Sequence, residues 1–557
     1  MTSANARRFA LILAVGLAGL ALVPTDVVLH WFRLLNPTPL QRQGAQVLRV
    51  MGLVSAAYIL VGVRNAWWSA PAEATMADRL APAERWGLAG LLGATLALRL
   101  WALGDGLWVD EVSTLVNYVR RPLGEIIATY DSNNQHALFS VLAHLSVGVF
   151  GESAWALRLP AAIFGTLTVL ALYFLARNLL GQRIAWWTAT LLAVSYQAIW
   201  FSQNARGYSG LLFFSVASTH FLVRGLQNSR DGRQWLGYAL MVGLGMYVHL
   251  TMLFVVAGQL VAYAAAWRSL PGGMRWRPLA AGFVASGVCT LLLYAPLLPQ
   301  IPGASARDTS TVAVWRSPVW LLRETLGGLG LGSSMLVAAV LGVAFLGTGL
   351  VRLWRVSPSV VITAVVSVAA GGLSMLALGH HLWPRFFIYA AGFGILILVV
   401  SIDVVGSWLG GRLALAPGRV WLLPTAGCTL LLLLMLRTLP QVYGPKQDYA
   451  GVRDFVVASM TAGDTVASVG VARVALRDYY APGWATVDNA DELRALASGH
   501  PRTWLVYTLP AEMEDNHPDV LAELARGWRH VRTFPGTLRG GDLLVYRREP
   551  AATSGGT

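Results

Sequence analysis

Residues 86–103 read "WGLAGLLGATLALRLWAL", and residues 104–114, which follow directly, read "GDGLWVDEVST". The first stretch is almost entirely apolar and long enough, as a helix, to cross the hydrocarbon core of a bilayer. The second places the carboxylates of Asp105, Asp110 and Glu111 at the end of that helix. An apolar helix that leads directly into an acidic cluster predicts a membrane protein with polar chemistry at one membrane face.

The composition of the chain extends this prediction to its whole length. Of the 557 residues, 55% are hydrophobic and 13% are charged, whereas soluble domains carry about 25% charged residues. Apolar runs long enough to span a membrane recur, and they predict an all-α polytopic fold with about thirteen transmembrane helices. The runs are 9–29, 46–63, 86–104, 157–177, 184–200, 210–224, 235–249, 251–267, 280–298, 332–351, 360–379, 386–402 and 419–436.

Two shorter or ambiguous runs need separate interpretation. Residues 136–150 are too short for a span and contain two histidines, so we expect a helix lying at the membrane interface in the first outer loop. Residues 7–23 have the basic start and apolar core of a signal peptide. No convincing cleavage site follows them, and we expect an uncleaved first helix.

The arginines predict how the helices are oriented. If Arg7 and Arg8 are cytoplasmic, every predicted inner loop carries arginine, as the positive-inside rule expects. Some arginines also lie on the outer side, so the pattern is not uniform. The orientation nevertheless predicts a multi-pass protein with residues 104–114 outside the cell membrane.

The charge and the cysteines exclude other classes of protein. The net charge of +14 is explained by these loop arginines, and no basic block with interleaved aromatic residues predicts nucleic-acid binding. Cys289 and Cys428 both lie inside apolar runs, and no ligand spacing for a metal is present. We therefore expect no structural metal and no disulfide framework.

The polarity changes after Pro440 and divides the chain into three parts. Residues 441–557 contain no apolar span, and they alternate strand-like runs ("DTVASVGVA", "RTWLVYTL", "DLLVYRR") with the helical run "PDVLAELARGW". This pattern predicts a small extracytoplasmic α/β domain with a disordered tail. The remaining parts are 1–85, with two additional helices and a cytoplasmic loop, and 86–440, the main transmembrane domain.

The acidic residues favour an enzyme over a transporter. Ten lie between Trp86 and Pro440, six of them in the first outer loop, and none in the middle of a span. Ion-coupled transporters usually keep ionisable groups near the bilayer midplane. The simplest alternative for Asp110 is that it caps the helix "EVSTLVNYVRR". That interpretation loses weight because other polar clusters lie at the same predicted face: "FSQNARGYSG" (201–210), "MYVHLT" (246–251), "YAPLLPQ" (294–300) and "GHHLWPRFFIY" (379–389).

These motifs resemble the bacterial family 39-type glycosyltransferases, which are membrane enzymes of the GT-C fold and include protein O-mannosyltransferases and aminoarabinose transferases. The resemblance covers roughly 86–440 and is carried in order by "WVDE" (108–111), "NNQHALFSVLAHLSVGVFGESAWALRLPAAIFG" (133–165), "SQNARGY" (202–208), "YVH" (247–249), "YAP" (294–296) and "PRF" (384–386). The chain departs from the family pattern at His136-Ala137, where prolines often follow the histidine, and at Phe386, where tyrosine is common.

The resemblance implies transfer of a sugar from a polyprenyl-phosphate donor to an acceptor hydroxyl on the extracytoplasmic side. It assigns Asp110 as the general base and Glu111 as a residue that positions or tunes it. No cofactor is expected: the donor is a substrate, and a divalent metal is possible but not expected. Candidate residues for the donor phosphate or sugar are Arg206, Tyr208, Gln203, His249, Tyr247, Arg385 and His381, and candidates for the acceptor or loop are Asp131, Asn134 and His136.

Two other functions remain open. A lipid or polysaccharide flippase or transporter is the first alternative, and a non-catalytic scaffold whose α/β domain binds glycan is the second. A donor-dependent transfer assay separates the enzyme from both. The identity of the sugar and of the acceptor, which is a lipid, a glycan, a small molecule or a protein, stays open.

Overall fold

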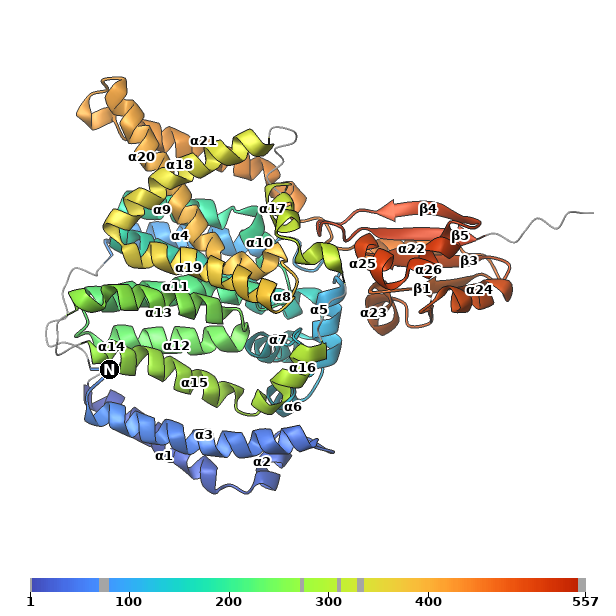
Figure 1. Ribbon diagram of the computed structural model, residues 1–557, viewed down its shortest axis with the longest axis horizontal. Helices are drawn as coiled ribbons and strands as arrows, with labels where there is room; N and C mark the ends of the chain where they lie inside the picture. The colour runs from blue at the N-terminus through green and yellow to red at the C-terminus, as the bar shows by residue number, and fades with distance from the viewer. Residues whose placement is uncertain (1–2, 70–79, 271–274, 308–311, 328–334, 549–557) are drawn as a thin grey trace, which may run out of the picture.

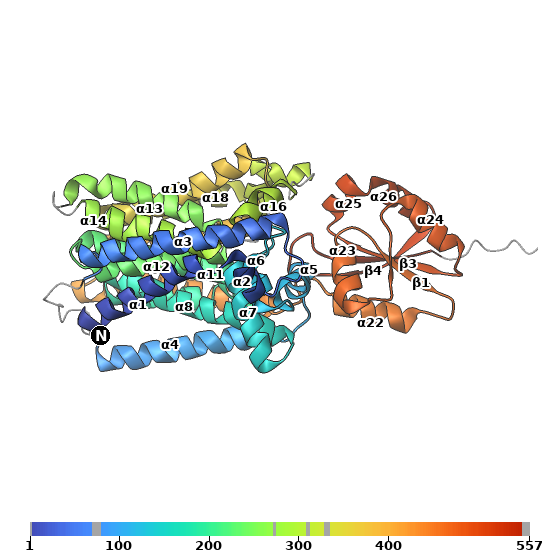
Figure 2. The ribbon, with the colours of Figure 1, turned by 90° about the horizontal axis from the view of Figure 1, so that it is seen from below.

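The computed structural model describes residues 3–69, 80–270, 275–307, 312–327 and 335–548. It consists of a large helical part with a small α/β part at one end (Figure 1). Most helices of the large part run side by side, and the pair α1 and α3 lies along one side of it. The acidic loop after residue 103 lies at the end that faces the α/β part, near the label α5 in Figure 2.

Each predicted span coincides with a helix or with a pair of consecutive helices. These are α1 (Ser3–Leu22), α3 (Pro39–Arg64), α4 (Pro82–Leu100), α8 (Ala154–Leu180), α9 (Gln182–Ala193) with α10 (Tyr196–Ser202), α11 (Tyr208–Gln227), α12 (Gly232–Val248), α13 (Met252–Ala266), α14 (Trp276–Pro278) with α15 (Ala285–Tyr294), α18 (Met335–Val356), α19 (Pro358–Ala377), α20 (Ala391–Arg412) and α21 (Leu422–Val442).

Nine of the helical segments in the described residues are long and apolar enough to cross a membrane. The multi-pass helical architecture is therefore confirmed, while the total of thirteen spans stays a prediction. Two of the remaining helices are short: α9 has 12 residues and α12 has 17, whereas a helix needs about 20 to cross the hydrocarbon core without local thinning.

The connection between α4 and α8 folds into short helices. They are α5 (Val109–Thr114), the π-helical turn η2 (Leu115–Val119), α6 (Leu123–Ala128) and α7 (Ala137–Phe150). The helix expected over 136–150 is confirmed as α7, which is apolar and only 14 residues long. The capping interpretation of Asp110 is wrong in detail, because α5 begins at Val109 and Asp110 therefore lies inside its first turn.

The remaining connections supply the other polar segments at this end of the bundle. They are α2 (Thr25–Trp31), α16 (Ile301–Arg307), α17 (Pro318–Gly327) and the 3₁₀ helix η9 (Pro384–Ala390), which leads into α20. η9 packs against α11. A segment late in the chain is thereby brought next to the "SQNARGY" stretch that precedes α11.

The α/β part contains one five-stranded mixed sheet. Its strands are β1 (Thr465–Ser468), β2 (Ala485–Thr486), β3 (Thr503–Thr508), β4 (Trp528–Phe534) and β5 (Leu543–Arg548), in the order β2-β1-β3-β5-β4. β1 is parallel to β2 and β3, and β5 is antiparallel to β3 and β4. Its helices are α22 (Tyr449–Ser459), α23 (Ala472–Ala475), α24 (Ala490–Ser498), α25 (Pro510–Asn516) and α26 (Pro518–Leu524).

The sequence predicted three of these strands and helix α26. The central strand β3, "TWLVYT", is buried along its whole length, which explains its continuous apolar run. β4 was missed because it is an edge strand with charged, exposed side chains, a common protection of sheet edges. The expected disordered tail, "AATSGGT" (551–557), lies outside the described residues.

Candidate active site at the end of the helical bundle

Glu111 anchors the turn that carries Asp110. Its carboxylate is fully buried and accepts two hydrogen bonds from Arg158 of α8, at 2.7 Å from Nε and 2.5 Å from Nη2. The backbone N–H groups of Ala205 and Trp108 also donate to it, at 2.7 and 3.3 Å. Burial by itself would raise the pKa of Glu111, but the charges of Arg158 and Lys446 hold it below its ordinary value. Glu111 is therefore an ionised anchor beneath the turn.

Arg158 organises the backbone of the same loop. Its guanidinium donates to the carbonyl oxygens of Leu103, Asp105 and Gly106 at 2.8–3.0 Å, in addition to Glu111. One buried arginine thus joins α8 to the end of α4 and to the start of α5. Arg158 lies within the motif "ESAWALRLPAAIFG", yet no role was predicted for it.

Asp110 lies on the more open side of this turn, between two arginines. Its carboxylate is 3.2 Å from Nη1 of Arg385, in η9, and 3.9 Å from Nη1 of Arg206, just before α11. The Asp110 side chain keeps 22% of its exposure, whereas that of Arg206 keeps 4%. The Arg385 guanidinium is also within 6.0 Å of the rings of Trp383 and Trp108. Three segments far apart in sequence therefore place one carboxylate and two guanidinium groups together.

A cluster of aromatic and imidazole rings lies behind Arg206. The ring centroids of His136 and His249 are 4.6 Å apart, and that of Tyr208 is 5.5 and 5.1 Å from them. Gly207 permits this approach, because a Cβ there would lie 2.4 Å from the carbonyl oxygen of Val248. Burial, then the charge of Arg206, lowers the pKa of His136 well below its ordinary value, so its imidazole is neutral.

Two buried nitrogens in this cluster have no hydrogen-bond partner within the described residues. They are Nε of Arg206 and Nε2 of His136. Another guanidinium nitrogen of Arg206 donates to the side-chain oxygen of Asn134. Buried polar groups normally carry partners. Nε2 of His136 is an acceptor, because Nδ1 donates to the carbonyl oxygen of Val248, so the arrangement suits a polar ligand that accepts from Arg206 and donates to His136.

Several predicted site residues lie elsewhere or make other contacts. The amide nitrogen of Gln203, a predicted donor-site residue, donates to the carbonyl oxygens of Arg99 and Trp101 and closes the end of α4; its contact with the donor stays a prediction. Asp131 accepts hydrogen bonds from Tyr118 and Arg121.

Two further predicted residues pack against aromatic rings. Tyr247 lies edge-on to Tyr294. His381 lies edge-on to Trp315, and burial, then the charge of Arg385, lowers its pKa to about 4. The imidazole of His381 is therefore neutral in the field of Arg385.

The start of the α/β part completes the turn from its other side, and the sequence did not predict this. The backbone N–H of Val109 donates to Oε1 of Gln447 at 3.3 Å, and Nε2 of Gln447 donates to Thr508 of β3 at 3.0 Å. The hydroxyl of Tyr480 donates to the carbonyl oxygen of Leu107 at 2.8 Å. The α/β part is therefore bonded directly to the residues on either side of Trp108.

Tyr449 and Lys446 bring two more buried polar groups to this junction. Within the described residues the hydroxyl of Tyr449 has no hydrogen-bond partner, and burial, then the charge of Asp110, raises its pKa well above the ordinary value. Nζ of Lys446 donates to the carbonyl oxygen of Gln203 at 2.6 Å and lies 5.1 Å from the ring centroid of Trp200. Lys446 is the only lysine of the chain, a signal that could have singled it out.

The buried position of Lys446 predicts an unusual titration. Burial lowers its pKa from 10.5 to about 7, although Glu111 opposes the shift. Between pH values of about 7 and 10.5 the native state binds fewer protons than the unfolded state, so Lys446 makes the free energy of unfolding rise with pH over this range. Below a pH of about 7 both states are protonated, and the buried charge of Lys446 destabilises the native state to its full extent. Since Lys446 is the only lysine, ¹⁵N-lysine labelling should give one side-chain resonance with a midpoint near 7. A midpoint near 10.5 would contradict the buried environment.

No group of three or more histidine, cysteine, aspartate or glutamate side chains that could hold a metal occurs within the described ranges. The rings of His136 and His249 lie close together, but the third ring beside them is the phenol of Tyr208 and not another histidine. The chemistry available at this site is therefore that of a carboxylate, guanidinium groups, neutral imidazoles and phenols.

Comparison with known proteins shows a family likeness over part of the chain. Residues 136–299 match the model of the dolichyl-phosphate-mannose-protein mannosyltransferase family. This segment contains His136, Arg158, Arg206, Tyr208 and His249. No curated protein matches the chain.

Solved structures provide weaker likenesses. ArnT from Cupriavidus metallidurans bound to undecaprenyl phosphate has 15% identity and a TM-score of 0.44, and the match covers 85% of this chain and 99% of that one. The oligosaccharyltransferase of Archaeoglobus fulgidus has 11% identity and a TM-score of 0.45 over 80% of this chain and 71% of that one. The arabinosyltransferase EmbB from Mycobacterium smegmatis has 15% identity and a TM-score of 0.42 over 83% and 47%.

The resemblance drawn from the motifs is thereby confirmed on the segment that carries most of them. Over residues 136–299 this membrane protein is therefore similar to the mannosyltransferase-like glycosyltransferases of family 39.

Proposed function

We propose that this chain transfers a sugar from a polyprenyl-phosphate-linked donor to an acceptor hydroxyl, and that the reaction occurs at the end of the helical bundle next to the α/β domain. The observation that carries the proposal is the placement of Asp110 between Arg385 and Arg206, at 3.2 and 3.9 Å. A carboxylate with residual exposure suits proton abstraction, and two guanidinium groups suit a phosphate.

The proposed reaction needs one proton transfer and one displacement. Asp110 takes the proton from the acceptor hydroxyl as its oxygen attacks the anomeric carbon of the sugar. The bond between that carbon and the phosphate oxygen breaks, and its electron pair goes to the oxygen. Polyprenyl phosphate leaves as an anion, and Arg206 and Arg385 stabilise the negative charge that develops. Asp110 carries the proton until solvent removes it.

The ring cluster and the junction supply the remaining contacts of the proposal. Neutral His136 presents the buried, unpartnered Nε2 beside Arg206, and this nitrogen is assigned as the acceptor of a hydrogen bond from a sugar hydroxyl, since Nδ1 donates to the carbonyl oxygen of Val248. His249 and Tyr208 hold the shape of this pocket. Tyr449, from the α/β domain, is assigned to the acceptor side. Its buried hydroxyl has no hydrogen-bond partner within the described residues, and the charge of Asp110 contributes to raising its pKa.

The placement in the cell belongs to the same proposal. The chain is assigned a GT-C fold in a bacterial inner membrane, with Asp110 and the α/β domain on the extracytoplasmic side. That orientation rests on the arginines of the predicted inner loops and on the rule that such loops are cytoplasmic. We propose no metal or organic cofactor, since leaving-group charge is handled by arginine.

The arginines give the first test of the donor site. Arg206→Lys and Arg385→Lys keep the charge but lose the planar fork that makes two parallel hydrogen bonds to phosphate. We expect each to weaken donor binding or transfer by about 1.5–3 kcal/mol, the scale of a hydrogen bond to a charged group. Arg120→Lys is the control, because Arg120 pairs with Glu152 at the surface. Parental transfer rates in both test variants would mean that these arginines only anchor helices.

The activity itself is tested by following the leaving group. Purified protein is incubated with a membrane lipid extract that contains polyprenyl-phosphate sugars, and free polyprenyl phosphate is measured by mass spectrometry. We expect time-dependent release when an envelope fraction is added as acceptor. A protein that binds the donor lipid but releases no polyprenyl phosphate with any envelope fraction would contradict the proposal.

A further inference from the structure

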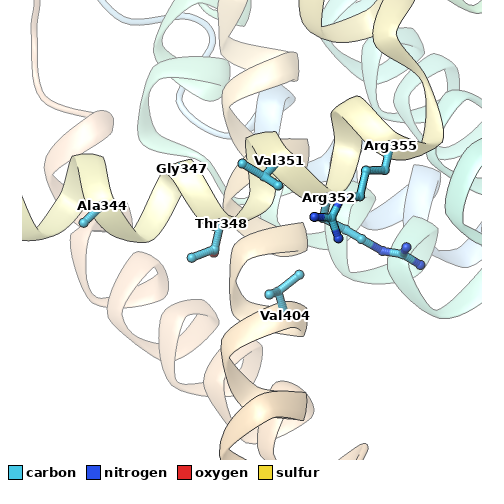
Figure 3. Close-up of a pocket in the computed structure, with 7 residues that line it drawn as sticks. All are labelled: Ala344, Gly347, Thr348, Val351, Arg352, Arg355 and Val404. Atoms are coloured by element: carbon cyan, nitrogen blue, oxygen red, sulfur yellow. The ribbon is translucent and has the colours of Figure 1, made fainter.

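A groove between α18 and α20 lies away from the candidate active site. Ala344, Gly347, Thr348 and Val351 of α18 and Val404 of α20 line it, and Arg352 and Arg355 close one end (Figure 3). Its volume is about 500 Å³. These arginines occupy the last turns of α18, whereas Asp110 and the α/β domain lie at the opposite end of the helical part (Figure 1).

The two arginines form a local concentration of positive charge. They are three residues apart in one helix, so their side chains share a face and repel each other. Within the described residues neither makes a hydrogen bond or an ion pair, and both are exposed. The nearby carboxylate of Asp403 is already paired with Arg183. An anion between the two guanidinium groups would relieve the repulsion.

The walls of the groove favour an amphipathic anion over a soluble one. Apart from Thr348, the residues that line it beyond the arginines are apolar or glycine. Val351 is 55% exposed and Trp354, beside the arginines, is 50% exposed. Tryptophan and arginine together at a helix end are typical of the head-group level of a membrane. A ligand that matches both the arginines at one end of the groove and its apolar walls has a phosphate and an acyl chain.

Gly347 gives the groove its depth. A Cβ at this position would meet nothing within 4 Å, so the space above the helix backbone is open. A chain of methylene groups fits against such a surface without displacing a side chain.

We propose that this groove binds one phospholipid with an anionic head group, its phosphate between Arg352 and Arg355 and one acyl chain along Gly347 and Val351. Basic pockets between transmembrane helices are a known way to hold anionic head groups. The site is separate from the donor site, and it ties the protein to anionic lipid at the membrane face opposite the α/β domain.

The test compares two phospholipids with the same acyl chains, one with an anionic and one with a zwitterionic head group. Purified protein in detergent receives phosphatidylglycerol or phosphatidylcholine with the same acyl chains, and native mass spectrometry measures retention. We expect the parent to retain one phosphatidylglycerol in preference, and Arg352→Gln/Arg355→Gln to retain it about tenfold less, a change of about one decade in the dissociation constant. Arg419→Gln, which changes an exposed arginine outside the groove, should behave like the parent.

The acyl-chain half has its own variant. Gly347→Leu places a side chain in the open space, where a Cβ meets nothing within 4 Å. It should weaken retention of both lipids, while thermal unfolding without lipid verifies that the variant is folded. Equal retention of the two lipids by the parent would overturn the proposal, as would undiminished phosphatidylglycerol in the double arginine variant or in Gly347→Leu. Stabilisation by inorganic phosphate with no difference between the lipids would identify a simple anion site and would also overturn it.

Discussion

Asp110→Asn should lower turnover by about 10²–10⁴-fold, the usual contribution of a general base. Asparagine keeps the size of the side chain and much of its hydrogen bonding, but it accepts no proton at neutral pH. The fold should survive, because the turn is held by Glu111 and Arg158 and not by Asp110. Initial rates of polyprenyl-phosphate release by the purified variant measure the effect.

Donor binding separates this loss from a loss of substrate. Asp110→Asn should bind the donor lipid at least as well as the parent, because the carboxylate no longer competes for Arg206 and Arg385. Asp105→Asn is the matched control, since Asp105 is an exposed carboxylate of the same loop. A folded Asp110→Asn protein that turns over within a few-fold of the parent would remove Asp110 from the mechanism.

The second large effect concerns stability. Arg158→Met should destabilise the protein by about 3–5 kcal/mol, the usual cost of removing one partner of a buried ion pair. The Glu111 and Arg158 side chains keep 0% and 3% of their exposure, so solvent does not screen the charge left behind. Arg158 also holds the carbonyl groups of Leu103, Asp105 and Gly106, and their loss adds to the effect. Thermal unfolding in detergent measures it.

A double variant distinguishes an unpaired charge from lost packing. Glu111→Met/Arg158→Met removes both charges, and replacing a buried pair by apolar residues is often close to neutral. The double variant should therefore be more stable than Arg158→Met while remaining inactive, because the turn that presents Asp110 loses its anchor. If Arg158→Met unfolds like the parent, the pair does not anchor the turn.

The sequence predicted the parts of this site that depend on periodicity and membrane face. Because a membrane span has a fixed length, the two ends of each apolar run can be assigned to the two membrane faces. This assignment predicted that Asp110, Arg206 and Arg385 lie at the same face. Side-chain direction is not set in this way. Gln203 belongs to the same short motif as Arg206, yet its amide closes the end of α4, because a helix end presents successive residues in different directions.

Contacts between parts that pack only in the folded protein were missed. Residues 441–557 read as a separate domain from their polarity, and nothing in their pattern indicates that Gln447 bonds to Val109 or that Tyr480 bonds to Leu107. The role of Arg158 was missed for a similar reason: an arginine at the start of a span has the pattern of an interface anchor. Only the fold shows that it grips a buried carboxylate.

The most direct test of glycosyl transfer at Asp110 is comparative mass spectrometry of the cell envelope. Lipids, glycans and proteins are analysed from a strain lacking this chain and from the same strain complemented with the parent or with Asp110→Asn. We predict that one product of defined mass is missing in the deletion, returns with the parent and stays missing with Asp110→Asn, while a polyprenyl-phosphate sugar accumulates in its place. Identical products in all strains, or full restoration by Asp110→Asn, would contradict the account.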